Sequence, residues 1–226
     1  MNISWKSRFI YEKQCIKTTW TLRVTVLVCV FLIAWLSSRF WTRAVGDSLV
    51  CDERLVPADA ILIENFDPDY LLFERAHALY KAGLASKVFV PTDASADGEE
   101  SMVSAGIVEV MSRIAWLEAR ETIPVRGIEP ISLNAAYQIL AALERHHIRS
   151  VLVVAPGFRS RRSALVYSEV LGRAGIAVSC VPVFGTKTPA TWATTWHGVQ
   201  EVGEQFVKLQ YYRWYVMPFY GSTQQS

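Results

Sequence analysis

An apolar run leads directly into a basic turn in the segment Val151-Leu152-Val153-Val154-Ala155-Pro156-Gly157-Phe158-Arg159-Ser160-Arg161-Arg162. Its unbroken apolar start is typical of a central parallel strand that is covered on both faces. The three arginines fall in what should be the first turn of a helix, where the helix dipole already supplies partial positive charge. Basic side chains are mildly unfavourable there unless an anion lies among them, so this segment is a candidate anion site. A solvated basic helix start is the alternative.

The same alternation of apolar runs and amphipathic stretches continues on both sides of this segment. Further strands are predicted at residues 60–63, 87–90, 122–125 and 177–183. Helices are predicted over about 69–82, 99–117, 132–147, 160–174 and 200–215, with Gly83 just after the first and Ser132 as the N-cap of the third. Strands separated by helices of this length predict an α/β fold, a doubly wound, mostly parallel, Rossmann-like sheet with helices on both faces.

In such sheets, ligands gather beyond the carboxyl ends of the strands. Four polar segments fall at that edge, and they are residues 64–67, 92–93, 129–132 and 157–162. One crevice is therefore predicted to collect carboxylates, an amide and guanidinium groups.

A long apolar stretch precedes the α/β pattern. Between Trp20 and Trp41 lie 22 residues counted inclusively, with Arg23 the one charge from Thr21 to Leu36. At about 1.5 Å per residue this spans roughly 33 Å, enough for a bilayer core. A cleaved signal peptide is the alternative, but bulky residues stand at 39–41, where small ones should precede the cut. We therefore predict an uncleaved signal anchor over residues 21–41.

Basic residues flank this anchor unequally. Five precede its apolar part and three follow it: Lys6, Arg8, Lys13, Lys17 and Arg23, against Arg39, Arg43 and Arg54. This bias predicts a cytoplasmic amino terminus and an extracytoplasmic main domain, with the chain a single-pass protein of a bacterial inner membrane. The predicted order is a basic segment 1–20, the anchor 21–41, a linker 42–57, the α/β domain 58–216 and a tail 217–226.

Charge and cysteine usage exclude some classes of protein. The first 23 residues carry five basic groups and Glu12, or +4, and the whole chain is +2, so residues 24–226 sum to −2. A domain so close to neutrality offers no broad basic face for nucleic acid. Of the four cysteines, Cys51 and Cys180 lie beyond the anchor, and their spacing favours two unrelated buried thiols over a disulfide. His77 and His197 have no partners at ligand spacing, so no metal site is predicted.

Several segments together resemble a known bacterial domain. They are residues 58–63, residues 75–85, the set Glu129, Ser132 and Asn134, and the pair Arg159 and Arg162, followed by Glu204, Lys208, Tyr211 and Tyr212. Over about residues 58–215 the chain resembles the domain shared by the SanA, YdcF and ElyC proteins, several of which are tied to envelope integrity. The resemblance implies an envelope protein with a ligand crevice, and it includes the single amino-terminal span.

The chain departs from that family at three places. A glycine-rich turn and a Ser-Gly-Gly turn are replaced by Glu64-Asn65-Phe66-Asp67 and Pro91-Thr92-Asp93. Those glycines would let backbone N–H groups approach a phosphate, whereas side chains now occupy that space. Arg159 replaces a histidine and cannot shuttle protons near neutral pH. The departures imply a different ligand or a lost activity.

The candidate ligand-binding residues follow from both arguments, and they are Glu64, Asn65, Asp93, Glu129, Ser132, Asn134, Gly157, Arg159 and Arg162. The two arginines form the predicted anion site. Asn134 either orients a ligand or is an exposed polar residue near a cap. Ser132 is predicted to be a cap rather than a nucleophile, because no base is placed to activate it. Glu64, Asp67 and Asp93 either position a hydroxyl-rich ligand or a cation, or satisfy N–H groups of their turns.

The sequence therefore predicts a membrane-anchored envelope protein. Its domain is expected to bind an anionic small molecule, phosphorylated or nucleotide-like, in cell-wall or surface-polysaccharide biogenesis. The alternative is a non-catalytic scaffold in which the pocket is degenerate and the anchor and the aromatic closing helix recruit envelope partners. No reaction and no cofactor can be named, because no nucleophile–base pair is recognisable.

Overall fold

The computed structural model describes residues 19–95 and 97–220. The chain forms two compact units that divide between Trp41 and Thr42. Most of the predicted basic segment 1–20 and the last six residues of the predicted tail lie outside the described residues.

The first unit contains most of helix α2 (Trp20–Ser48), which has 29 residues. Its apolar part has a mean hydropathy of 2.0 and no buried residues, so the helix is long and apolar enough to cross a membrane. The predicted anchor, residues 21–41, lies wholly within it. The last turns of α2 belong to the second unit, where the Trp192 indole N–H donates to the Thr42 carbonyl at 2.9 Å.

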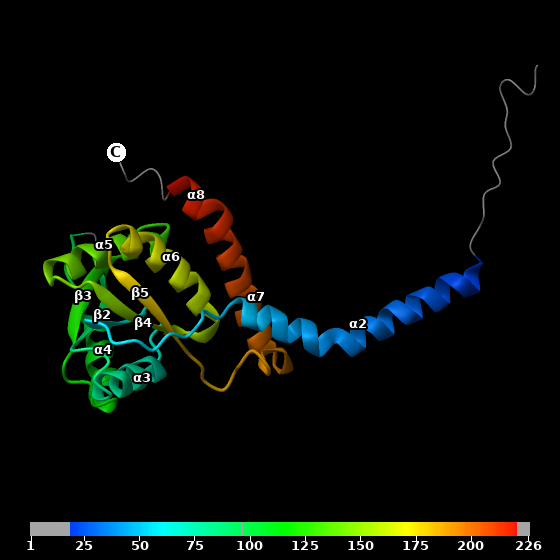
Figure 1. Cartoon of the computed structure of the whole chain (residues 1–226), viewed down its shortest axis with the longest axis horizontal. Coiled ribbons are helices and arrows are strands. Elements are labelled where there is room, and N and C mark those ends of the chain that lie inside the picture. The colour runs from blue at the N-terminus through cyan, green and yellow to red at the C-terminus, as the bar shows by residue number, and fades with distance from the viewer. Residues whose placement is uncertain (1–18, 96, 221–226) are drawn as a thin grey trace, which may run out of the picture. The chain divides into compact units, whose positions relative to one another are not determined.

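The second unit contains a five-stranded parallel sheet. The strands are β1 (Ala60–Ile63), β2 (Lys87–Ala94), β3 (Glu121–Arg126), β4 (Ser150–Pro156) and β5 (Ala177–Val183). Their order is β3-β2-β1-β4-β5, with every neighbouring pair parallel. This confirms the predicted doubly wound α/β fold (Figure 1). Strand β2 runs four residues further than the predicted strand 87–90.

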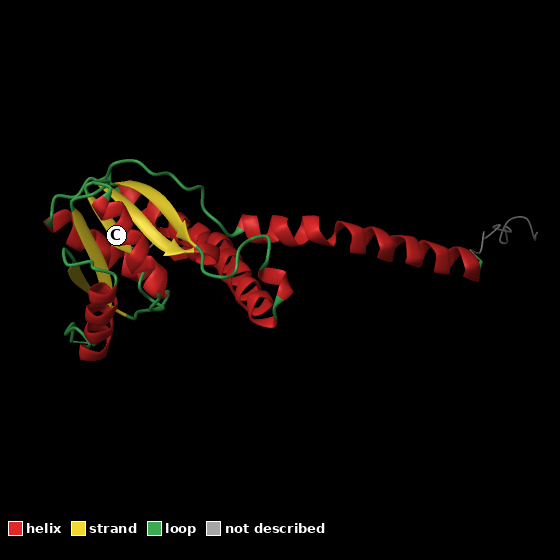
Figure 2. Cartoon of the chain, turned by 90° about the horizontal axis from the view of Figure 1, so that it is seen from below, coloured by secondary structure: helices red, strands yellow, loops and turns green. Residues whose placement is uncertain are grey.

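Helices cover both faces of this sheet (Figure 2). Helices α3 (Tyr70–Lys81) and α4 (Met102–Ile114) pack on one face, and α5 (Ile131–Arg145) and α6 (Ser160–Arg173) pack on the other. Alternate residues of β1 divide between the two layers. Ile61 and Ile63 join the α3/α4 core, whereas Ala60 and Leu62 join the α5/α6 core.

The chain closes with a continuous helical segment. Helix α7 (Trp196–Tyr211) is followed by a π-helical turn, η3 (Tyr212–Val216), and by the short α8 (Met217–Tyr220). Tyr212 and Val216 are buried in the α5/α6 core. The predicted tail therefore begins too early, because its first four residues are helical and η3 holds the segment against the domain.

The residues that cap helix α3 agree with its sequence, whereas the start of helix α5 differs from the prediction. Asp69 caps α3 by accepting from the Leu71 N–H at 3.0 Å, and Gly83 after that helix has φ +72°, as a C′ glycine should. The prediction that Ser132 is an N-cap is wrong. Helix α5 begins at Ile131, and Ser132 lies in its first turn with its N–H donating to the Tyr212 hydroxyl at 3.1 Å.

Residues 49–54, here called the strap, are packed against the domain, so the prediction of a linker fails for them. Leu49 is fully buried, and its carbonyl accepts from the Arg161 N–H at 3.0 Å. Cys51 forms a disulfide with Cys180 on β5, which corrects the prediction of two unrelated thiols. The Arg54 N–H extends the pairing by donating to the Cys180 carbonyl at 3.3 Å. The two cysteines are 129 residues apart, and no local pattern announces such a pairing.

The outer strands of the sheet each contain a proline, Pro124 in β3 and Pro182 in β5. Proline lacks a backbone N–H and is tolerated in sheets mainly at edges, which agrees with the position of both strands.

Candidate functional site

The site lies where the chain reverses its direction of winding. Strands β1 and β4 are neighbours, but β1 is followed by β2 on one side and β4 by β5 on the other. The segments that leave their carboxyl ends therefore diverge, and this opens a crevice at the switch point.

A buried cluster of charged and polar side chains fills the base of this crevice. Glu64, directly after β1, has 1% of its surface exposed, and Arg159 and Arg162, after β4, have 9% and 8%. Glu64 accepts a hydrogen bond from the Ser163 hydroxyl, and Arg159 forms an ion pair with Asp67. The Arg162 guanidinium carbon lies 5.3 Å from the centre of the Tyr212 ring. The buried charges of the crevice are therefore compensated mainly by other side chains of the protein.

Burial sets the ionisation of two groups in this cluster. It lowers the pKa of Arg162, while the negative charge of Glu64 raises it and the positive charge of Arg159 lowers it further. Arginine starts so far above neutrality that Arg162 stays cationic. Burial, with Glu64 adding to it, raises the pKa of Tyr167 well above its ordinary value, so its hydroxyl keeps its proton and remains a donor.

The start of α6 differs from the simple basic helix terminus that the sequence suggests. A 3-10 turn, η1 (Gly157–Arg159), comes first, and the three arginines then separate. Arg161 stays half-buried, 3.9 Å from Asp52, whereas Arg159 and Arg162 are buried in the crevice. Since the Arg161 N–H is taken by the Leu49 carbonyl, recognition of an anion here falls mainly to side chains.

Several buried polar atoms of the cluster have no hydrogen-bond partner among the described residues. They are the Nε atoms of Arg159 and Arg162, the Tyr167 hydroxyl, Asn65 Oδ1 and Gln205 Oε1. More than nine in ten buried polar groups are ordinarily satisfied. A group of unsatisfied donors and acceptors at one place is what a site for a polar ligand leaves open.

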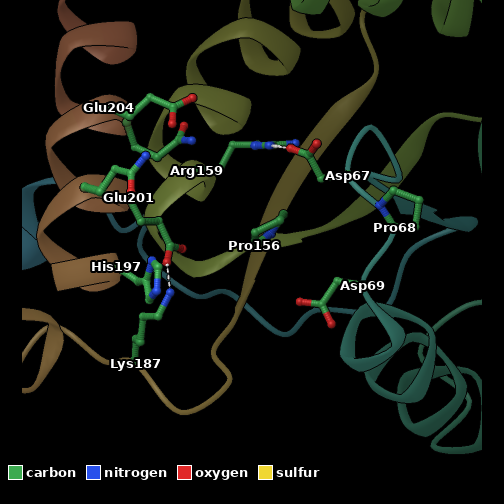
Figure 3. Close-up of a pocket in the computed structure, with 11 residues that line it drawn as sticks. Asp67, Pro68, Asp69, Pro156, Arg159, Lys187, His197, Glu201 and Glu204 are labelled. Carbon is green, nitrogen blue, oxygen red and sulfur yellow. Dashed lines mark hydrogen bonds and ion pairs between the residues drawn. The ribbon is translucent and has the colours of Figure 1, made fainter. Parts of the chain in front are cut away.

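A cavity of about 630 Å³ borders this cluster at Arg159. Figure 3 shows the residues that line it. Its volume lies within the range of about 300–1,000 Å³ that is usual for small-molecule sites. It lies between the loop after β1, the end of β4 and helix α7, and its lining residues are Asp67, Pro68, Asp69, Pro156, Arg159, Lys187, His197, Gln200, Glu201, Glu204 and Gln205.

Two ion pairs stand on the α7 wall of the cavity. Lys187 contacts Glu201 with an N–O distance of 2.7 Å, and Lys208 contacts Glu204 at 2.5 Å. The hydrogen bond from Lys208, with its positive charge, lowers the pKa of Glu204. Across the cavity, Figure 3 shows Asp69 at the start of α3, opposite Lys187 and Glu201.

The structure brings five of the nine predicted ligand residues to the switch point: Glu64, Asn65, Gly157, Arg159 and Arg162. Of these, Arg159 lines the large cavity. Gly157 has a packing role, because a Cβ there would lie 2.1 Å from the Phe184 ring. The close approach of that ring explains the glycine.

The other four predicted residues, Asp93, Glu129, Ser132 and Asn134, are not among the described residues that line this cavity. Asn134 holds the preceding loop by donating to the Ile128 and Pro130 carbonyls at 3.2 and 3.4 Å, and Glu129 accepts from the Ile131 N–H at 3.3 Å. The start of α5 is linked to the site through Tyr212, which accepts from the Ser132 N–H and lies against Arg162.

The α7 wall is the part of the site that the sequence reasoning missed. Its polar residues are His197, Gln200, Glu201, Glu204 and Gln205. They recur at the i, i+3, i+4, i+7, i+8 spacing of one helix face, so a polar stripe on a half-buried helix was the available signal. No comparable signal marked Tyr167, which lies within the core.

Comparison with protein-family models, curated proteins and solved structures finds no match to this chain. Within residues 19–95 and 97–220, no group of three or more His, Cys, Asp and Glu side chains is placed to hold a metal ion.

Proposed function

We propose that the chain is a single-pass, membrane-anchored envelope protein whose extracytoplasmic α/β domain binds an anionic, phosphorylated small molecule. The observation that carries this proposal is the pair of buried guanidinium groups, Arg159 and Arg162, whose Nε atoms have no partner among the described residues. They lie at the switch point, where ligands of doubly wound sheets bind.

Arg159 is the group that meets the ligand. It borders the cavity, and its ion-pair partner Asp67 has a side chain that is 77% exposed. An exposed carboxylate can leave a buried guanidinium at small cost when a phosphate takes its place, because planar, bidentate pairing suits both anions. Arg162 lies behind Arg159 and adds positive charge, held in place by Tyr212.

The location rests on separate support. Helix α2 has the length and composition of a membrane span. The excess of basic residues before it favours a cytoplasmic amino terminus. The Cys51–Cys180 disulfide is of the kind that persists in oxidising compartments, which favours a domain outside the cytoplasm. Together with the resemblance to the SanA, YdcF and ElyC domain, these features favour a role in cell-wall or surface-polysaccharide assembly.

The test uses the full chain in lipid nanodiscs. Its thermal unfolding is followed with nucleotides, sugar phosphates, S-adenosylmethionine and polyprenyl-phosphate analogues, for the natural protein and for Arg162→Ala and Arg159→Ala. A ligand at 100 times its dissociation constant should stabilise the natural protein by about 2.7 kcal/mol. We expect the shift to vanish in both variants and to persist in Arg161→Ala, because the half-buried Arg161 is not among the residues that line the cavity. If Arg159→Ala and Arg162→Ala respond like Arg161→Ala, the site is not at the switch point.

A second candidate, the non-catalytic scaffold, is favoured by a different observation. Helix α4 buries one face on the sheet yet exposes a second apolar stripe, formed by Val103, Ile107, Val110 and Ile114, with the indole of Trp116 beside it. A helix that is apolar on both faces usually has a partner on each. If Val110→Asp with Ile114→Asp abolishes function in cells, while Arg159→Ala with Arg162→Ala leaves it intact, recruitment rather than ligand binding is the function.

A further inference from the structure

The charges around the large cavity restrict the ligand more than the arginines alone suggest. Four carboxylates line it, those of Asp67, Asp69, Glu201 and Glu204, against the cations Arg159 and Lys187. Lys187 is already paired with Glu201, so Arg159 is the cation that an exchange with the exposed Asp67 can release. A ligand with several negative charges along its length would meet carboxylates beyond its first anionic group. The cavity therefore suits one anionic group, bound at the Arg159 end.

A smaller cavity of about 240 Å³ continues from the large one. The two share Asp69, Pro156, Lys187 and Glu201 as lining residues. The smaller cavity then extends along the loop after β5, past Thr186. The ligand space is therefore a two-part cleft, with Arg159 in one part and the Asp69 and Lys187–Glu201 groups at the junction.

The walls of this cleft offer few faces on which a nucleobase could stack. Among the residues that line the two parts, the aromatic ones are His197, Phe158 and Phe184. Phe158 is buried, and Phe184 is packed edge-on to it, with ring centres 5.7 Å apart, and against Gly157. Base recognition ordinarily uses an aromatic or guanidinium face. Because Arg159 is assigned to the phosphate, His197 is the one such face left among the described lining residues, which disfavours a nucleotide.

The polar groups at the junction are instead suited to hydroxyl groups. Carboxylates accept hydrogen bonds from hydroxyls and an ammonium donates to them. Asp69 uses Oδ1 for the cap of α3 and Glu201 uses Oε2 for Lys187, and in each case the second carboxylate oxygen takes no part in that bond. Gln205 Oε1, buried and without a partner in the described part of the chain, is a further acceptor on the cavity wall.

We propose that the ligand is a monophosphorylated sugar or sugar alcohol. Its phosphate binds Arg159 after displacing the Asp67 carboxylate. Its hydroxyl groups bind Glu201 and Asp69 at the junction of the two cavities and Gln205 on the wall of the larger one. This assignment rests on the proposed anion site and names the chemical class that the site selects.

The test measures binding to the full chain in nanodiscs by calorimetry. The probes are glucose 1-phosphate, mannose 1-phosphate, sorbitol 6-phosphate, glucose, inorganic phosphate and uridine monophosphate. Glucose 1-phosphate, mannose 1-phosphate and sorbitol 6-phosphate are here called the polyol phosphates. At least one of them should bind at least ten times more tightly than glucose, inorganic phosphate or uridine monophosphate.

Variants test which residues bind the phosphate of the ligand and which bind its hydroxyl groups. Gln205→Ala removes a hydroxyl acceptor without changing the charge of the cavity, so it should weaken binding of the polyol phosphate about tenfold and leave inorganic phosphate unchanged, whereas Arg159→Ala should weaken both. Glu169→Ala removes an acid that pairs with Arg173 outside the cleft, and it should change neither. If Arg159→Ala fails to fold, binding of the same probes is measured with Arg159→Lys, which keeps the charge.

Two results would overturn the assignment while leaving the anion site in place. One is tighter binding of uridine monophosphate than of any polyol phosphate, with loss in Arg159→Ala. The other is equal binding of inorganic phosphate and the polyol phosphates. No binding of any phosphorylated probe by a folded protein overturns the assignment together with the anion site itself.

Discussion

Strands β1 and β4 lie side by side in the middle of the sheet, and their two ends carry charge in opposite ways. At the amino end, the exposed carboxylate of Asp59 accepts hydrogen bonds from the Arg149 and Ser150 N–H groups and the Ser150 hydroxyl at 2.8, 2.9 and 3.0 Å. At the carboxyl end, Glu64 and the two arginines are buried, and both guanidinium Nε atoms lack partners among the described residues.

The difference separates charge that serves the fold from charge that is available to a ligand. Asp59 ties two neighbouring strands together and has its hydrogen bonds supplied by the backbone. The carboxyl end keeps expensive groups away from water without satisfying all of them, which no requirement of the sheet explains. Variants at and near the two ends test whether they differ in this way.

The largest effect is expected for Glu64→Ala. Removing this carboxylate leaves two buried guanidinium groups with less compensation, which should lower the free energy of unfolding by about 3–5 kcal/mol. Urea unfolding of the full chain in detergent, followed by tryptophan fluorescence, measures it. Glu100→Ala, which removes an exposed carboxylate that accepts from Thr92 at 2.6 Å, should cost only about 1 kcal/mol. Equal losses in the two variants would contradict a special role for the buried cluster.

The disulfide should rank next, because the strap attaches to the carboxyl end of this strand pair through α6. Cys51→Ser with Cys180→Ser should lower the free energy of unfolding by about 2–5 kcal/mol, since the cross-link closes a long loop. Cys29→Ser, an exposed free cysteine on α2, is the matched control and should leave stability unchanged. If the double variant is as stable as the control, the cysteines do not pair in the protein.

Gly157→Ala tests how closely the backbone is packed where β4 ends. Its new Cβ would overlap the Phe184 ring, and overpacking of this kind costs about 1–3 kcal/mol. Gly172→Ala, on α6, meets nothing within 4 Å and should be neutral or stabilising by up to about 1 kcal/mol. Phe184→Ala in the Gly157→Ala protein should restore part of the loss; a lack of any rescue would assign the strain to another contact.

The smallest effect is expected at the amino end, and it depends on pH. Hydrogen bonds from the Arg149 N–H and the Ser150 hydroxyl lower the pKa of Asp59. A lowered pKa means that this stabilisation is present above the ordinary value near about 4 and is lost as pH falls through the lowered one. Near neutral pH, the free energy of unfolding of the natural protein should be higher than that of Asp59→Ala by less than about 1 kcal/mol, because the carboxylate is exposed. Urea unfolding at several pH values should show the two proteins converging in acid, and a constant difference would exclude Asp59 titration as its source.

Much of the fold could be predicted because its signals are local. The apolar runs of β1 and β4 and the glycine after α3 each identify an element without knowledge of its neighbours. The position of Arg159 and Arg162 at the carboxyl edge of the sheet followed in turn from the alternation of strands and helices, since parallel strands present their carboxyl ends to one edge.

The errors share a physical cause, which is pairing between distant segments. The strap and its disulfide join residues that are 129 positions apart, and the start of α5 is fixed by Tyr212 from the end of the chain rather than by Ser132 as a cap. Which arginines are buried was also beyond the sequence, because Arg159, Arg161 and Arg162 are chemically alike. Their different surroundings come from Asp67, Asp52 and Tyr212, which are supplied by three separate elements.

The borders of the sheet have a consequence for how this domain can meet other proteins. The Cys180 carbonyl on the outer side of β5 already accepts from Arg54, and Pro182, two residues on and so facing the same way, has no N–H to offer. Pro124 interrupts the border strand β3 in the same manner. Strand addition requires a run of free donors and acceptors along an edge, so both edges of this sheet are poorly suited to pairing with an extended peptide or with the edge of a second copy. The prolines therefore protect the domain against edge-to-edge aggregation and favour recognition through side chains on its helices and loops.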